Sequence, residues 1–76
     1  MRELVERIVK QIVNNPDKVE VREVEGGRVT VVEVSTAKED VGLVIGRKGK
    51  MANALRTIVG AVAAKLGKRA IVEILE

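Results

Sequence analysis

The sequence predicts an α+β fold in the order helix, strand, strand, helix, helix, strand, with a three-stranded mixed sheet whose helices pack on one face. Apolar residues recur at helical spacing near the N-terminus and again from about residue 50 to residue 66. Valines alternate with polar residues in two segments around a Gly-Gly pair, which indicates two antiparallel strands. The chain has 76 residues and no repeats or linkers, so we expect one domain over residues 1–76.

The first helix is expected over residues 3–13, where one face is apolar. Its apolar residues are Leu4, Val5, Ile8, Val9, Ile12 and Val13. Asn14-Asn15-Pro16 follows, and Pro16 disfavours the helical conformation of the residue before it. The helix is therefore expected to end before this proline.

Residues 19–25 and 28–35 are expected to form a β-hairpin joined by Gly26-Gly27. A two-residue Gly-Gly link favours a type I′ turn, because both central residues of that turn need positive φ. This register would pair Val24 with Val29. The hairpin should therefore be tight, with its turn at the two glycines.

The two faces of this hairpin differ in what they are expected to meet. One face should pack against the helices, and it consists of Val19, Val21, Val32 and Val34. Val24, Val29 and Val31 fall on the opposite face near the hairpin tip. This second patch is either a twisted tip that folds inward or a surface for another subunit.

A short helix is expected over residues 37–44, capped by Ser35 or Thr36. Glu39 and Asp40 would lie in its first turn, where the helix dipole favours negative charge. A loop should follow before the next helix begins.

The longer second helix of this pair is expected from Lys50 to Leu66. Its apolar face would contain Met51, Leu55, Ile58, Val59, Val62 and Leu66, with alanines on the flanks at positions 52, 54, 61, 63 and 64. Gly67 should end the helix, and residues 69–75 should form the last strand. Because two helices join the second and third strands, these strands should be parallel neighbours.

The charges are unevenly distributed, although the net charge is only +3. No Asp or Glu occurs between Val41 and Val72. The same stretch contains Arg47, Lys48, Lys50, Arg56, Lys65, Lys68 and Arg69. This half of the chain is therefore either a polyanion-binding surface or simply a solvated face.

A basic dipeptide between two glycines, Gly46-Arg47-Lys48-Gly49, lies between the two predicted helices. Glycine permits a sharp turn and a close approach of a phosphate. The next helix begins at Lys50, and its N-terminal dipole favours an anion. The loop is thus either a phosphodiester site or an ordinary helix connection. It is not a nucleotide-binding P-loop, because Val44 stands where the first glycine of that motif would be.

Several function classes lack support. Without His, Cys or Tyr, the usual general bases and nucleophiles are missing, so we expect no enzyme. No ligand cluster suggests a metal, and we expect no cofactor. No apolar run reaches the ~20 residues that cross a bilayer, and no signal peptide is evident, so a cytoplasmic protein is expected.

The segment Val44-Ile45-Gly46-Arg47-Lys48-Gly49-Lys50, placed between two helices, resembles the signature of type II KH domains. The resemblance covers nearly the whole chain and extends to the small bacterial single-KH proteins of the KhpA family. Further similar stretches are residues 14–16, 19–26, 39–42, 55–57, 67–69 and 72–76.

The resemblance implies a binding site for single-stranded RNA. KH domains hold about four nucleotides and clamp their backbone with the Gly-x-x-Gly loop. Gly46, Arg47, Lys48 and Gly49 would be the clamp, Val44 and Ile45 would wall a groove for bases, and Lys50, Asn53 and Arg56 would reach phosphates or base edges. Asn53 and Arg56 are equally well explained as solvated helix residues.

The resemblance also implies a cellular role and partners. It suggests an RNA chaperone or post-transcriptional regulator linked to cell shape and cell-wall biogenesis. It implies self-association as a homodimer or pairing with a larger KH-containing protein, so the alternative function is a protein–protein assembly module. Single-stranded DNA in place of RNA stays open.

Overall fold

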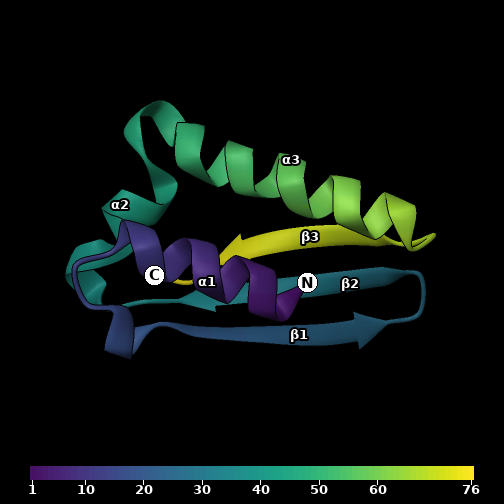
Figure 1. Ribbon diagram of the computed structural model, residues 1–76, viewed down its shortest axis with the longest axis horizontal. Helices are drawn as coiled ribbons and strands as arrows, with labels where there is room; N and C mark the ends of the chain where they lie inside the picture. The colour runs from purple at the N-terminus through teal and green to yellow at the C-terminus, as the bar shows by residue number, and fades with distance from the viewer.

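The computed structural model describes residues 1–76 and has the predicted α+β architecture (Figure 1). Its elements are α1 (Arg2–Ile12), η1 (Pro16–Lys18), β1 (Glu20–Gly26), β2 (Val29–Ser35), η2 (Lys38–Asp40), α2 (Val41–Ile45), η3 (Arg47–Gly49), α3 (Lys50–Lys65) and β3 (Arg69–Ile74). The sheet has the order β1-β2-β3, with β1 antiparallel and β3 parallel to β2. The helices cover one face of the sheet, which confirms the predicted topology (Figure 1).

The core between the helices and the sheet is entirely aliphatic. It consists of Val5, Val9, Val13, Val19, Val21, Val32, Val34, Val44, Leu55, Val59 and Val72. All four valines predicted for the inner face of the hairpin belong to it. Side chains of α1, α2 and α3 therefore pack in one core with side chains of all three strands.

The turn of the hairpin differs from the prediction by one position. Gly26 pairs with Val29, so the two central residues are Gly27 and Arg28, not the two glycines. Gly27 has φ 67°, whereas Arg28 has negative φ, which fits a type II′ turn and not the expected type I′ turn. The predicted pairing of Val24 with Val29 is therefore wrong, and Val24 pairs with Val31.

The second face of the hairpin does not fold inward. Val24 is 44% exposed, and Val31 beside it is half-buried. Val31 is also in register with Ile71 of β3, which is 53% exposed. These three side chains form an apolar row across the outer face of the sheet, which we call the outer row.

The buried face of α3 is turned relative to the predicted one. Ala52, Leu55, Val59 and Ala63 are buried, whereas the predicted core residues Ile58 and Leu66 are 42% and 60% exposed. The spacing of the buried set is still helical. Two alanines in this stripe let the helix pack close to the sheet beside the buried Leu55 and Val59, while Ile58 and Leu66 lie on the exposed side.

The start of α2 is held by a buried carboxylate and not by the predicted Ser35 or Thr36 cap. The Thr36 hydroxyl donates to the Ala37 carbonyl at 3.0 Å, and the helix has no side-chain cap. Asp40 is completely buried, and its Oδ2 accepts hydrogen bonds from the backbone N–H of Asn15 at 2.9 Å and from Asn15 Nδ2 at 3.0 Å. Asp40 therefore ties the segment after α1 to the start of α2.

Candidate nucleic-acid interface

The loop between α2 and α3 is a compact turn and interrupts the helical path. Gly46 has φ 78° and ψ 170°, and Gly49 has φ 75° and ψ 12°. Lys48 has φ 57° and ψ 26°, which is the left-handed conformation. Gly46 N–H donates to the Gly42 carbonyl at 2.9 Å, and Gly49 N–H donates to the Gly46 carbonyl at 3.1 Å. Three of the four loop residues thus have positive φ, and the chain changes direction sharply between α2 and α3.

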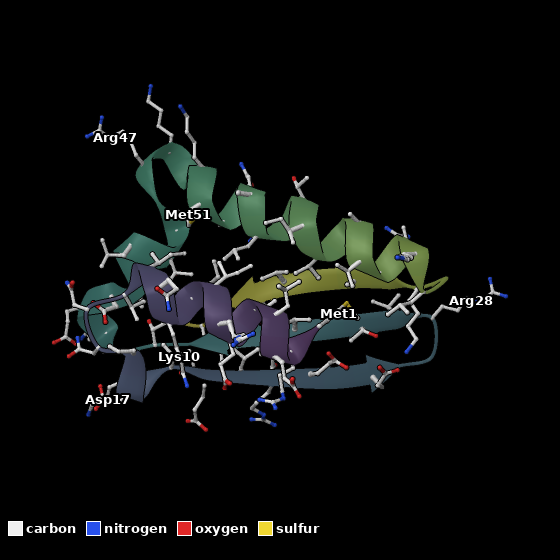
Figure 2. The ribbon with its side chains drawn as sticks, in the orientation of Figure 1. Met1, Lys10, Asp17, Arg28, Arg47 and Met51 are labelled. Atoms are coloured by element: carbon white, nitrogen blue, oxygen red, sulfur yellow. The ribbon has the colours of Figure 1, made fainter.

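Gly46 is required by its closeness to the first turn of α3. A Cβ atom at Gly46 would lie 2.7 Å from the Cβ and 2.8 Å from the backbone nitrogen of Met51. Both distances are far shorter than a van der Waals contact. Figure 2 labels Met51 at the start of α3, beside this segment. The absence of a side chain at Gly46 therefore lets the loop fold directly onto α3.

The cations of this loop are exposed and have no carboxylate partner. Arg47, Lys48 and Lys50 are solvent-exposed, and none of them takes part in an ion pair or a side-chain hydrogen bond. Figure 2 shows Arg47 projecting from the loop away from the sheet. The positive end of the α3 dipole lies at the same place. The loop therefore presents an uncompensated positive charge that suits an anion.

The remaining predicted site residues lie on both sides of this loop. Val44 is completely buried, so its side chain supports the site from the core and is not accessible to a ligand. Ile45 is half-buried next to the loop. Asn53 and Arg56 are exposed on α3, where Arg56 Nη1 donates to Asn53 Oδ1 at 3.4 Å. Together with Lys50 they follow one side of the helix at three-residue spacing.

The surface around the loop is open. The structure contains no pocket, and it has no group of three acidic, His or Cys side chains placed to hold a metal ion. None of the helices combines the length and apolar character that crossing a membrane requires. A ligand of this surface would therefore be bound along an exposed face and not enclosed.

Two residues that hold the start of α2, the helix before the loop, were not predicted for that role. The sequence indicated Asn15 only as part of a helix end and Asp40 only as a first-turn acid. Their hydrogen bonds join positions 25 residues apart, so no local pattern could reveal them. An acidic residue just before a short apolar helix was the one available signal.

The comparisons with known proteins agree over the whole chain. The family model described as KhpA/KhpB, KH domain, matches residues 2–74. The RNA-binding protein KhpA of Caldanaerobacter subterraneus subsp. tengcongensis is 51% identical over 75 residues, which are 99% of this chain and 100% of that protein. The proteins of the same name from Aquifex aeolicus and Clostridium acetobutylicum are each 45% identical, over 100% and 99% of this chain and 96% and 100% of their own lengths. No solved structure matches the chain.

Proposed function

Because the chain belongs to the KhpA/KhpB family of KH domains, we propose that it is a non-catalytic protein that binds single-stranded RNA by its backbone at Gly46–Gly49. Its relatives are named as RNA-binding proteins and not as enzymes. The observation that carries the proposal is the tight turn with three exposed, unpaired cations at the start of α3.

The mechanism follows from the shape and charge of the turn. Without side chains at Gly46 and Gly49, a phosphodiester can approach the main chain closely. Arg47 and Lys48 then supply positive charge from the tip, and the α3 dipole adds to it. Ile45 offers an apolar surface beside the loop, supported from below by Val44. Lys50, Asn53 and Arg56 extend the polar surface along α3.

Replacing Lys48 by Asp is expected to lower the affinity for single-stranded RNA by about tenfold or more, because it removes one phosphate contact and adds a repulsive charge. Asp tolerates the left-handed conformation of this position better than most residues, so the fold should survive. Fluorescence anisotropy with a labelled oligonucleotide measures the affinity, and circular dichroism checks the fold.

Lys18→Asp is the matched control for this substitution. Lys18 is exposed on η1 and has no ion pair, so its replacement makes the same change in net charge outside the loop. It should weaken RNA binding much less than Lys48→Asp. Equal RNA affinity of the Lys48→Asp variant and the unaltered protein would refute the assignment of the clamp.

Binding is also expected to depend steeply on salt. The chain has no aromatic residue, so it lacks base stacking on rings, which contributes about 1–3 kcal/mol per base where it occurs. Each phosphate contact to a single strand contributes about 0.7 to the slope of log affinity against log salt. Three loop cations should therefore give a slope of about 2 in a titration from about 50 to about 200 mM salt. A flat response would exclude a phosphate-dominated mechanism.

At the level of the cell, the proposal is a cytoplasmic RNA chaperone or post-transcriptional regulator connected with cell shape. It is supported by the family resemblance alone. RNA cross-linking in cells tests it, by comparing the native chain with a variant that carries Asp at both Arg47 and Lys48. Transcripts lost from the variant would identify the RNAs held by the loop. Binding of the same oligonucleotides as DNA, measured in parallel, would show whether the chain prefers RNA.

The outer row favours a second function, assembly with another copy or with a larger KH-containing protein. Val24 and Ile71 are exposed, with the half-buried Val31 between them, on the face of the sheet that no helix covers. Lys48→Asp separates the two functions, because it should reduce RNA binding and leave self-association in analytical ultracentrifugation unchanged. Loss of both together would mean that assembly needs RNA.

A further inference from the structure

A second group of cations lies at the end of the domain opposite the Gly46–Gly49 loop. We call this group the basic end, and it consists of Arg28, Lys65, Lys68 and Arg69. The residues come from the β1–β2 turn, the last turn of α3, the connection after it and the start of β3. Figure 2 shows Arg28 and Arg47 at opposite ends of the molecule. The backbone N–H of Arg69 donates to the Arg28 carbonyl at 3.0 Å, so these distant positions are direct neighbours.

Two of these cations have a structural explanation. Lys68 Nζ pairs with Glu25 Oε1 at 3.2 Å across the end of the sheet. Lys65 lies in the last turn of α3, where the negative end of the helix dipole favours a cation. Neither residue alone would indicate a ligand.

Arg28 and Arg69 have no such explanation. Both are exposed, and neither forms an ion pair or a side-chain hydrogen bond. The backbone hydrogen bond makes the two residues neighbours, so both guanidinium groups can reach an anion at this end of the domain. The planar guanidinium group matches the geometry of a phosphate. The pair therefore has the chemistry of a phosphate-binding surface.

The distance between the loop and the basic end sets the length of RNA that could touch both. The 16 residues of α3 lie between them and span about 24 Å. At the duplex rise of about 3.4 Å per nucleotide this span corresponds to about seven nucleotides, and an unstacked strand covers it with fewer. A strand of 12 nucleotides is therefore long enough to reach from one end to the other even when it is stacked.

We propose that Arg28 and Arg69, assisted by Lys65, bind phosphates of the same single-stranded RNA that the loop holds, so that the domain contacts two separate parts of one strand. This inference rests on the proposed function of the loop. The first contact raises the effective concentration of the second, so long RNA gains affinity that short RNA does not. The lone domain would then favour extended, unpaired RNA through strand length and not through sequence.

The test compares a 4-nucleotide and a 12-nucleotide oligouridine in fluorescence anisotropy. The variant Arg28→Glu/Arg69→Glu should bind the 4-mer as the unaltered chain does and should bind the 12-mer about tenfold or more weakly. Its salt slope for the 12-mer should fall by about 1.4, which corresponds to two lost phosphate contacts on a single strand. The control Lys10→Glu/Lys18→Glu makes the same change in net charge at exposed positions on α1 and η1, outside the basic end. It should leave the advantage of the 12-mer over the 4-mer intact.

The possible outcomes distinguish this inference from the proposed function. Unchanged binding of the 12-mer by the Arg28/Arg69 variant overturns the second contact and leaves the loop in place. An equal loss of affinity for both oligonucleotides also overturns it, and so does an equal loss in the Lys10→Glu/Lys18→Glu control. In both cases the substitutions would act only through the net charge of the protein. If Lys48→Asp changes neither oligonucleotide while the Arg28/Arg69 variant weakens the 12-mer, the loop assignment fails instead.

Discussion

Replacing Gly46 by Ala is expected to lower the free energy of unfolding by about 3 kcal/mol. Two effects act together at this position. The backbone has φ 78° and ψ 170°, a region that residues with a Cβ essentially avoid. In addition, the new Cβ would overlap with the backbone nitrogen and the Cβ of Met51, which belong to the rigid first turn of α3. Neither the loop nor the helix can yield without losing the turn.

Thermal unfolding followed by circular dichroism measures this effect. For a domain of this size, about 3 kcal/mol corresponds to a fall in Tm of about 15 °C. Gly60→Ala is the control, because a Cβ at Gly60 within α3 meets nothing within 4 Å. Ala has a higher helix propensity than Gly, so that variant should gain about 0.5–1 kcal/mol. A Gly46→Ala protein as stable as the unaltered one would show that the loop does not lie against Met51.

Replacing Asp40 by Ala is expected to lower the free energy of unfolding by about 2–4 kcal/mol. The substitution removes the acceptor of two hydrogen bonds and leaves both donors of Asn15 without a partner in a partly buried site. Asp40 Oδ1 is buried without any partner, so the native carboxylate already carries a desolvation cost. This cost offsets part of the contribution of the two bonds and keeps the net effect in the lower part of what two charge-assisted bonds could give.

Urea unfolding of the Asp40→Ala and Asp17→Ala variants measures the difference. Asp17 is exposed and has no ion pair, so its replacement changes the net charge equally and should leave stability within about 0.5 kcal/mol. Asp40→Asn should lie between the two, because an amide oxygen can still accept from the Asn15 backbone. Equal midpoints for the two alanine variants would mean that the Asp40–Asn15 contact contributes nothing to stability.

The topology could be predicted because it depends on patterns that small errors do not disturb. The predicted hairpin register differs from the observed one by two residues. Val21 and Val32 nevertheless face the core as predicted, since side chains alternate with a period of two. The turn type was wrong because Gly26-Gly27 is a strong local signal, whereas strand pairing places Gly26 inside β1. The buried stripe of α3 was misplaced because hydrophobicity alone favours Ile58 and Leu66 over Ala52 and Ala63.

The loop was the most predictable part of the candidate site, because its glycines and cations are contiguous in the sequence. What the sequence could not give is the depth of each side chain. Val44 and Ile45 are equally apolar neighbours, yet Val44 is completely buried and Ile45 is half-buried. The Asp40–Asn15 contact was missed for a related reason, since its two residues meet only when the chain is folded.

The left-handed conformation of Lys48 has a consequence for engineering. A residue with a Cβ in this conformation costs roughly 1–2 kcal/mol that a glycine would avoid. A library of variants selected only for thermal stability should therefore accumulate Gly or Asn at this position, and the loop would lose one positive charge. A library selected for RNA binding should keep Lys at this position, although its Tm would be lower. The two selections would therefore favour different residues at the same position.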